Sequence, residues 1–505
     1  MTSVLAVDAG TTGVTALVVD DAGAVIARGY REFAQHFPEP GWVEHEPADI
    51  WAAVLGATGD ALATSPTAPV ALGLTNQRET AVLWDRQTLR APRRAVVWQD
   101  RRTTAICSQL RDEGHEPRVR ELTGLRLDPY FTATKLTWLR QHEPATWQGV
   151  ESGALAIGTV DSYVLARLSG GATHATDASN ASRTLLYDLR AAGWSEELCD
   201  LFGVPLAALP QVRASAGDFG RTDPGSFHGL ALPITGIAGD QQAALFGQAC
   251  FATGSSKCTY GTGSFVLVNT GDWPVVSEAG LLTTVAWDLG AGTVYALEGA
   301  IFVTGAAVQW LRDGLGLIGS AAEVEALAAT VDDSGGLVFV PALTGLGAPD
   351  WDPDARGAIQ GITRGTTAAH LARATLEAIA FEVRDVVDVM SREAGLALAE
   401  LTVDGGASAN NLLCQLQADQ LGVPVRRPRT LETTGLGAAF LAGLGARVWG
   451  STDELAASWQ LDRRFEPRPG VRHDGSHALW RRAVDRTRGW AAQQGQYPHE
   501  PPLEG

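Results

Sequence analysis

Hydrophobic and polar positions alternate in short runs over the first part of the chain. VLAVDAG is an apolar run that ends in a polar turn, VTALVVD follows the TTG turn, and AVIARGYREF follows the DAG turn. Runs of this kind between glycine turns are typical of β-strands. The pattern predicts three antiparallel strands with Asp8 at the first turn. From Pro47 to Ala63 the apolar positions take helical spacing, which predicts a helix.

Predicted strands and helices alternate along the rest of the chain. VALGLTNQRET predicts a buried strand with a polar loop at its end, and AVLWDRQT predicts another strand. In the second half, KCTYGTGSFVLVNTG, LLTTVAWDLG and GTVYALEG predict a second meander of three strands, followed by helices at AAVQWLRDGLG and AAEVEALAATV. Apolar residues three or four positions apart predict a long amphipathic helix at 365–390. LTVDGGASANNLLCQLQADQLG then predicts a strand, a glycine turn and a helix.

Two halves with the same order of elements favour an α/β fold of two actin-like, ribonuclease-H-like ATPase domains around a central cleft. We place the first domain at residues 1–248, on the substrate and phosphate side, and the second at residues 249–490, on the nucleotide side. No internal repeat in the sequence is strong enough to show this alone. Residues 491–505 are rich in Pro, Gly and polar groups, and we expect a flexible tail there.

Composition narrows the class of protein. A chain of 505 residues suits two domains, and 45% hydrophobic with 19% charged residues is ordinary for a globular protein. No run of ~18 apolar residues offers a membrane span. The start lacks a basic leader segment, so we expect a cytoplasmic protein. A formal charge of -18 argues against binding to nucleic acid. The five cysteines lack C-x-x-C spacing, which predicts buried free thiols.

Three glycine turns are candidate phosphate sites. DAGTTG offers backbone N–H groups and the hydroxyls of Thr11 and Thr12, and Asp8 can hold a magnesium ion. YGTGSF and VDGGASANN add two more turns in the second half, the latter at a helix start. Each turn alone is equally consistent with ordinary turn chemistry. Together, and spread over both halves, they favour a nucleotide phosphate. Because the G-x-x-x-x-G-K-[ST] motif is absent, an ATP site here must depend on glycine turns and metal.

Candidate substrate groups lie at the ends of two predicted strands. Arg78 and Glu79 stand side by side in TNQRET, where a guanidinium and a carboxylate can serve the vicinal hydroxyls of a polyol. Trp98 and Phe265 are candidates for an apolar wall against the carbon atoms of that polyol. The alternative is a surface ion pair and two core aromatic residues.

A series of motifs resembles the FGGY carbohydrate kinase family, and within it the branch that phosphorylates glycerol. The likeness runs from Val4 to about Phe465, through GLTNQRET, VVWQDRR, LDPYF, GTVDSY, TDASNASRT, GIAGDQQAALFGQ, YGTGSF, LEGAIFVTGAAVQWLRD, PALTGLGAPDWDP, ARGAI, VDGGASANN and LGAAFLAGL. The resemblance implies that ATP and Mg²⁺ are used to convert glycerol to sn-glycerol 3-phosphate in glycerol catabolism. We expect glycerol and ATP as partners and a homodimer or homotetramer.

The resemblance also implies roles for individual residues. Substrate contacts fall on Arg78, Glu79, Trp98, Tyr130, Asp240, Gln241 and Phe265. Nucleotide contacts fall on Thr11, Thr12, Gly13, Thr262, Gly263, Gly305, Gln309, Gly406 and Asn410, and the metal falls on Asp8. Asp240 is the implied catalytic base, because a glycerol hydroxyl is a poor nucleophile until a carboxylate orients it and accepts its proton. The alternative for Asp240 is a helix N-cap.

The chain departs from the family pattern at two positions. The family's first motif usually continues as GTTSSR, with an arginine that reaches the transferred phosphate, whereas this chain reads GTTGVT with Thr15 at that position. The aromatic residue usual in GAPYW is Asp350 here. Three alternatives stay open: a kinase for another polyol or ketose, an actin- or chaperone-like ATPase that binds proteins, and a kinase-like protein that binds its ligand without turnover.

Overall fold

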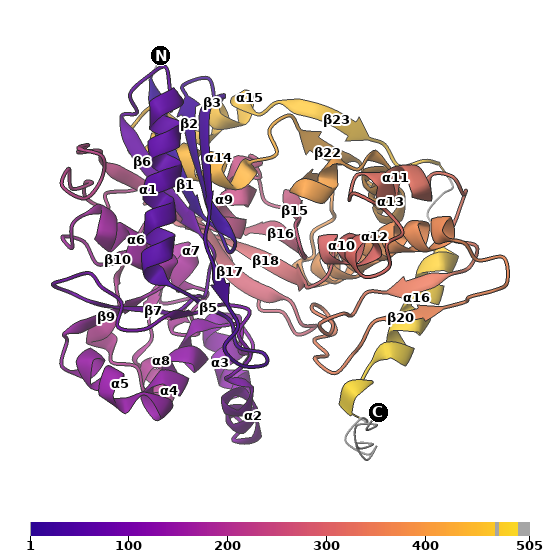
Figure 1. Cartoon of the computed structure of the whole chain (residues 1–505), viewed down its shortest axis with the longest axis horizontal. Helices are drawn as coiled ribbons and strands as arrows, with labels where there is room; N and C mark the ends of the chain where they lie inside the picture. Colours follow the sequence, from indigo (N-terminus) through magenta and orange to yellow (C-terminus); the bar gives the residue numbers. More distant parts are fainter. Residues whose placement is uncertain (1, 470–473, 493–505) are drawn as a thin grey trace, which may run out of the picture.

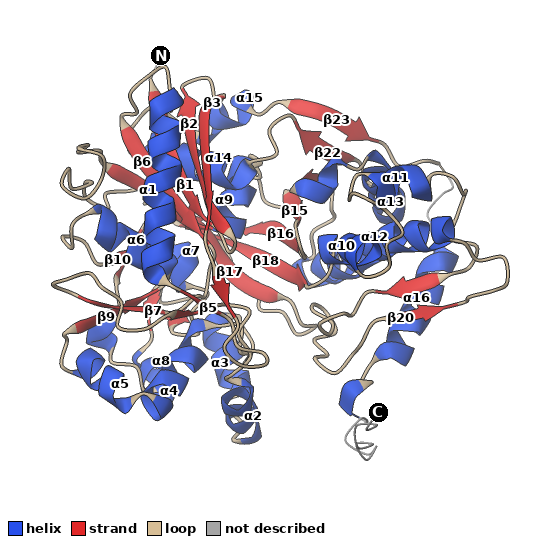
Figure 2. Cartoon of the chain, in the orientation of Figure 1, coloured by secondary structure: helices blue, strands red, loops and turns tan. Residues whose placement is uncertain are grey.

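The computed structural model describes residues 2–469 and 474–492, and these form a two-domain α/β fold around two large sheets (Figures 1 and 2). The first sheet has the strand order β14-β6-β1-β2-β3. Its strands are β1 (Ser3–Ala9), β2 (Gly13–Asp20), β3 (Val25–Glu32), β6 (Ala71–Asn76) and β14 (Ile234–Gly239). The first three form the expected antiparallel meander, while β6 pairs with β1 in parallel and β14 with β6 in parallel.

The first sheet is covered on both faces, because successive side chains of a strand point to opposite sides. Leu5 and Val7 of β1 belong to the same apolar cluster as residues of helix α1 (Pro47–Thr64), which is the helix expected from Pro47 on. Val4 and Ala6 belong to a different cluster, together with residues of α14 (Thr433–Gly445). The centre of this sheet is therefore buried on both faces.

The second sheet repeats the pairing of the first. It has the order β17-β18-β16-β15-β21-β22-β23, with β15 (Ser256–Tyr260), β16 (Ser264–Gly271), β17 (Leu282–Asp288), β18 (Thr293–Ile301), β21 (Leu401–Asp404), β22 (Val425–Pro428) and β23 (Leu461–Phe465). β15 pairs antiparallel with β16 and parallel with β21, as β1 does with β2 and β6. The expected three-strand meander has four strands, because KCTYGTGSFVLVNTG holds both β15 and β16 around its glycine turn.

Helix α14 comes from the second half of the chain but packs on the first sheet. In Figure 1 its yellow ribbon lies among the indigo strands, against β1 and β6 and against α9 (Asp240–Gly247). A Cβ on Gly437 would lie 1.8 Å from the carbonyl oxygen of Ala243, so this close helix pair requires glycine. The division of the chain at residue 248 stays a prediction, and α14 is one segment from beyond it that completes the core of the first sheet.

The remaining elements surround the two sheets. The other helices are α2 (Thr104–Asp112), α3 (Glu116–Thr123), α4 (Thr132–His142), α5 (Pro144–Glu151), α6 (Val160–Leu168), α7 (Ala178–Ala181), α8 (Glu196–Phe202), α10 (Gly305–Asp313), α11 (Glu323–Ala328), α12 (Ala368–Ala394), α13 (Asn411–Leu421), α15 (Thr452–Ser458) and α16 (Asp474–Thr487). The short strands are β4 (Gln35–His36), β5 (Glu44–His45), β7 (Val82–Asp85), β8 (Ala95–Val96), β9 (Leu155–Gly158), β10 (Ala175–Asp177), β11 (Tyr187–Asp188), β12 (Gly193–Trp194), β13 (Gln211–Arg213), β19 (Val338–Val340) and β20 (Ala358–Gln360). α12 is the long amphipathic helix expected from the spacing of its apolar residues.

Three sequence expectations concern features outside the site. All five cysteines are buried and free, which confirms the expectation of buried thiols. Among residues 2–469 and 474–492, none of the helices combines the length and the apolar character that crossing a bilayer requires. The tail expected at residues 491–505 lies, from residue 493 on, outside the described residues.

Candidate active site

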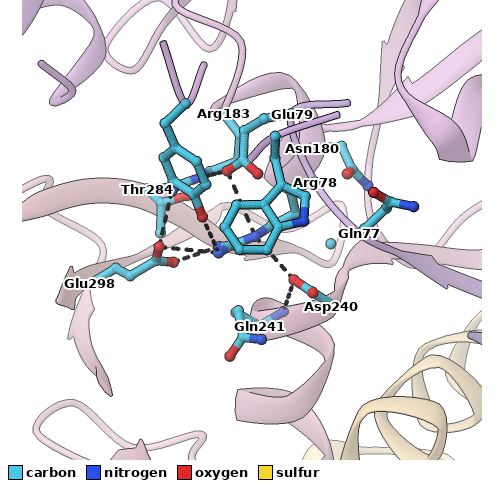
Figure 3. A network of polar contacts seen from close by, with 12 residues as sticks. Gln77, Arg78, Glu79, Asn180, Arg183, Asp240, Gln241, Thr284 and Glu298 are labelled. Carbon is cyan, nitrogen blue, oxygen red and sulfur yellow. Dashed lines mark hydrogen bonds and ion pairs between the residues drawn. The ribbon is translucent and has the colours of Figure 1, made fainter. Parts of the chain in front are cut away.

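Two neighbouring parallel strands bring Arg78 and Asp240 together. Arg78 follows the end of β6 and Asp240 follows the end of β14, and these two ends are in register at Asn76 and Gly239. The carboxyl ends of parallel strands meet at one edge of a sheet, where ligand sites of α/β proteins lie. Arg78 Nε is 3.0 Å from Asp240 Oδ1 (Figure 3). The side chain of Asp240 is 27% exposed and that of Arg78 only 2%, so Asp240 is the member of the pair that a ligand can reach.

Glu298, on β18 of the second sheet, holds the other side of the Arg78 guanidinium. Its two carboxylate oxygens accept hydrogen bonds from Arg78 Nη1 at 2.5 Å and from Arg78 Nη2 at 3.1 Å. Arg78 Nε lies 3.8 Å from the Glu79 carboxylate, farther than the 3.0 Å that separates it from Asp240. The alternative of a surface ion pair is wrong, because the side chains of Arg78 and Glu79 are both nearly fully buried.

Arg183 closes this network of charges. It donates from Nε to Glu79 at 2.7 Å and from Nη2 to Glu298 at 2.9 Å. Burial raises the pKa of Glu79 although Arg78 and Arg183 oppose it. Burial also disfavours the ionised form of Glu298, but Arg183 and Arg78 outweigh it and lower the pKa of that carboxyl group. Glu298 is thus the carboxylate that neutralises the two buried guanidinium groups.

Three aromatic side chains gather around Arg78. The ring of Trp98 lies edge-on to that of Tyr130 at a centroid distance of 5.5 Å and to that of Phe265 at 6.5 Å. Arg78 Nη2 donates to the Tyr130 hydroxyl at 3.3 Å, and the Arg78 guanidinium carbon lies 5.7 Å from the centre of the Phe265 ring. The three residues come from separate parts of the chain and are brought together by the fold; we call them the aromatic wall, and their contact with a substrate stays a prediction.

Asp240 occupies the first turn of α9 without capping it. The N-cap residue is Gly239, and among the described residues the one backbone N–H that donates to Asp240 Oδ1 is that of the next residue, Gln241, at 2.7 Å. The N-cap alternative is therefore wrong. Burial raises the pKa of Asp240, against the opposing effects of Arg78 and Lys257. A carboxyl group with a raised pKa is a better proton acceptor near neutral pH than an ordinary aspartate.

A cavity of about 380 Å³ in the second half is lined by most of the residues implied for nucleotide binding. Among the implied residues, its lining includes Thr262, Gly305, Gln309, Gly406 and Asn410. Asn410 also caps α13, since its Oδ1 accepts from the backbone N–H of Leu413 at 2.8 Å. The cavity lies between α10, the turn after β15 and the 3₁₀ turn at Gly406–Ala409.

Glycine is required where these segments approach each other. A Cβ on Gly305 would lie 2.7 Å from the carbonyl oxygen of Gly261, and one on Gly263 would lie 2.2 Å from that of Ile301. The backbone N–H of Gly305 donates to Gly261 at 3.0 Å. The glycine turn after β15 and the start of α10 therefore form one wall with exposed backbone groups. Gly263 contributes to this wall by its packing and is not itself part of the cavity lining.

Asp8, Thr11, Thr12 and Gly13 lie on the first sheet, outside that cavity. The turn between β1 and β2 is closed by the Gly10 N–H donating to the Gly13 carbonyl at 3.0 Å. Thr11 Oγ1 accepts from Trp98 Nε1 at 3.0 Å, which ties this turn to the aromatic wall, and Thr12 is exposed. A Cβ on Gly13 would lie 2.6 Å from the Arg31 carbonyl oxygen, so packing against β3 already demands glycine there.

The carboxyl group of Asp8 is affected by two other acidic residues. Its pKa is raised to about 8 by burial, by Asp240 and by Glu432. Thr15, the position where the family carries arginine, pairs with Asp8 across the β1–β2 ladder. Position 15 therefore supplies no guanidinium group to offset the carboxyl groups of Asp8, Asp240 and Glu432.

Asp350, the second departure, has a structural explanation away from the site. Its carboxylate accepts hydrogen bonds from Arg481 Nη1 and Nη2, both at 3.1 Å, and from Arg488. Arg481 belongs to α16, so Asp350 fixes this C-terminal helix to the body of the second half.

Three buried residues of the site were not singled out from the sequence: Arg183, Glu298 and Lys257. Arg183 and Glu298 lie inside quoted motifs, TDASNASRT and LEGAIFVTGAAVQWLRD, in which no role was given to either. A signal for Glu298 was available, because a single charge inside an apolar strand such as VYALEGAI needs a buried partner. Lys257 is completely buried and donates to the side chain of Gln241.

Comparison with known proteins shows the family. The FGGY family of carbohydrate kinases, N-terminal domain, matches residues 3–247, and its C-terminal domain matches residues 256–446. A curated glycerol kinase of Aromatoleum aromaticum is 55% identical over 496 residues, covering 97% of this chain and 100% of that protein. One of Citrifermentans bemidjiense is 54% identical, covering 97% and 99%. The solved structure of Plasmodium falciparum glycerol kinase with ADP is 33% identical with a TM-score of 0.89, covering 96% and 98%. The chain belongs to the FGGY family of carbohydrate kinases.

Proposed function

We propose that this chain transfers the γ-phosphoryl group of ATP to glycerol and forms sn-glycerol 3-phosphate. The observation that carries the proposal is the partly exposed Asp240 carboxylate, held by the buried Arg78 next to Trp98, Tyr130 and Phe265. The names and full-length similarity of the curated relatives support the same substrate.

The polar and apolar groups of this site fit a small polyol. Asp240, oriented by Arg78, offers a partly exposed acceptor to a hydroxyl group, and the aromatic wall packs against carbon. A buried site of this kind rejects analogues that lack a hydroxyl by up to ~10⁴, because its polar groups are then left unpaired.

ATP fits the cavity between α10, α13 and the turn after β15. Thr262, Gly305, Gln309, Gly406 and Asn410 would contact the nucleotide, with Gly263 shaping the wall. Thr11, Thr12 and Gly13, on the turn between β1 and β2 of the first sheet, would receive the phosphate end. This assignment places the nucleotide mainly on the second half and the acceptor mainly on the first.

Magnesium fits the residues around Asp8. Carboxylate oxygens are the ligands that this hard cation prefers, and it keeps waters and phosphate oxygens as its other ligands, so one or two carboxylates are enough. In the described part of the chain there is no group of three or more His, Cys, Asp or Glu that could hold a metal by itself. Asp8 would hold the ion, which when bound would neutralise charge on the phosphates.

The chemistry of the chain's own residues follows from Asp240. The glycerol hydroxyl donates its proton to the Asp240 carboxylate while its oxygen attacks the γ-phosphorus, and the bond from that phosphorus to the ADP oxygen breaks. Arg78 orients the carboxylate through the 3.0 Å contact and is itself held by Glu298. Closure of the two halves would exclude water and limit ATP hydrolysis.

A coupled assay of ADP release tests the proposal across glycerol, dihydroxyacetone, erythritol, ribitol and xylulose. We expect the highest kcat/KM with glycerol and almost no activity with 1-propanol. A higher kcat/KM with a larger polyol or a ketose would favour a kinase for that other polyol or ketose. Absence of ADP release with every acceptor would favour a kinase-like protein that binds its ligand without turnover. We also propose a cytoplasmic location. We further propose a homodimer or homotetramer, and sedimentation of the purified chain tests this oligomeric state.

A further inference from the structure

Lysine is rare in this chain and is found only at two buried positions. Of the 39 Lys and Arg residues only two are lysines, Lys135 and Lys257, and both are fully buried. Long charged side chains are almost never fully buried unless they are paired. Lys257 lies on β15 of the second sheet, next to the proposed acceptor site on the first. Its ammonium group therefore needs partners, and one of them, Gln241, belongs to the proposed acceptor site.

The contacts of Lys257 lead directly to Gln241. Lys257 Nζ donates to Gln241 Oε1 at 2.5 Å and to Thr259 Oγ1 at 2.8 Å. Gln241 follows Asp240 in the first turn of α9 and is 6% exposed, and Figure 3 shows it beside Asp240, to whose carboxylate its backbone N–H donates at 2.7 Å. Lys257 thus contacts Gln241, the residue that follows the proposed base Asp240 in the chain.

The chemistry of these groups fixes the orientation of the Gln241 amide. An ammonium group has three donors and no acceptor, so the amide atom that faces Lys257 must be the carbonyl oxygen. The NH₂ group of Gln241 is then turned away from Lys257. Among the residues that the structure describes, none accepts a hydrogen bond from this NH₂ group. It is a free donor in a nearly buried position.

We propose that Lys257 is a positioning residue that locks the Gln241 amide with its NH₂ group toward the substrate, so that Gln241 recognises a hydroxyl oxygen by donating to it. This inference rests on the proposed function. An N–H donor in that position donates to a hydroxyl oxygen but conflicts with an ammonium group, which has no lone pair to accept with. Lys257 would therefore make the enzyme selective for a polyol over the corresponding amino alcohol.

Selectivity against amino alcohols tests this role. We would measure kcat/KM for glycerol, 2-amino-1,3-propanediol and 3-amino-1,2-propanediol near neutral pH, where both amines are protonated. Lys257→Met frees the amide to rotate and present its carbonyl oxygen. Gln241→Glu keeps a partner for Lys257 but removes the N–H donor. We expect each variant to lower the preference for glycerol over at least one amine by about tenfold or more, the effect of relieving one mispaired buried polar group.

Lys135→Met is the matched control, because it removes the other buried lysine. Lys135 Nζ donates to the backbone carbonyls of Pro129, Tyr130 and Phe131 and has no contact with Gln241 among the described residues. This variant should keep the wild-type ratio between glycerol and amine whatever its overall activity. Melting midpoint and ADP affinity check the fold of each variant, and Gln241→Glu provides the test if Lys257→Met does not fold.

The outcomes separate this inference from the proposed function. If the wild-type chain phosphorylates glycerol but Lys257→Met and Gln241→Glu both keep its preference over both amines, the orienting role of Lys257 is wrong. If the ratio changes equally in Lys135→Met, the effect belongs to loss of a buried charge and the inference is also wrong. If the wild-type chain does not use glycerol at all, it is the proposed function that fails.

Discussion

Replacing Glu298 by glutamine tests whether the buried charge network holds the site together. Glu298 makes three charge-assisted hydrogen bonds, two to Arg78 and one to Arg183, and is completely buried. Glutamine keeps the shape but loses the negative charge, and its NH₂ group would face guanidinium donors. Glu79 and Asp240 would then be the remaining carboxylate partners of the two arginines among the described residues.

The size of the effect follows from burial. Removing one partner of a buried ion pair costs about 3–5 kcal/mol, because the other charge stays buried without compensation. At about 2–4 °C per kcal/mol for a domain of this size, the melting midpoint should fall by roughly 6–20 °C. Activity with glycerol should also fall, since Arg78 loses the group that fixes its guanidinium opposite Asp240.

A matched control is available on the surface. Glu400 also bridges two arginines, Arg426 and Arg464, but its side chain is 32% exposed. Exposed pairs contribute about 0–1 kcal/mol, so Glu400→Gln should lower the midpoint by less than about 4 °C. Calorimetry of both variants in the same buffer decides the matter. A shift for Glu298→Gln no larger than that for Glu400→Gln would refute the argument that this network stabilises the site.

Three further predictions concern the phosphate side. Thr15→Arg should raise turnover with glycerol, because a guanidinium opposite Asp8 would offset the carboxylates there; steady-state ADP release measures it, and an unchanged or lower rate would show that the chain has compensated. Asp8 has a folded pKa of about 8, above its ordinary value, so the metal-free protein should lose stability as pH rises from about 4 through 8. Mg²⁺ favours the carboxylate, so it should raise the melting midpoint more at about pH 8.5 than at about pH 6, and Asp8→Asn should remove this difference. Gly406→Ala should weaken ADP binding in calorimetry without changing the melting midpoint, because its Cβ would meet no protein atom within 4 Å and Gly406 lines the cavity; equal ADP affinity would place the nucleotide elsewhere.

The sequence predicted the order of strands and helices well where the apolar pattern is regular. The first meander, α1 and α12 follow directly from the spacing of their apolar residues, and the fold class follows from the repeated order. The position of α14 could not be predicted. Its sequence is apolar all round, so periodicity does not say which sheet it covers, and the glycine contact with Ala243 appears only in three dimensions.

The candidate site was predictable from motifs only in part. Arg78, Trp98 and Phe265 could be proposed from residue type, whereas Tyr130 and Asp240 came from the family resemblance. The partners of Arg78 could not be read from the sequence, which suggested its neighbour Glu79 and missed Glu298, 220 residues away. Long-range pairing of charges depends on which strand ends meet, and that is set by the order of strands in the sheets.

The rate of phosphoryl transfer in Asp240→Asn is the most direct test of the account. The amide oxygen can still accept from Arg78 and from the Gln241 backbone, so the fold and the ADP affinity should be kept. Because the proton acceptor is lost, kcat with glycerol should fall by about 10²–10⁴. A variant that keeps more than about a third of the wild-type kcat would contradict the role of Asp240 as the base.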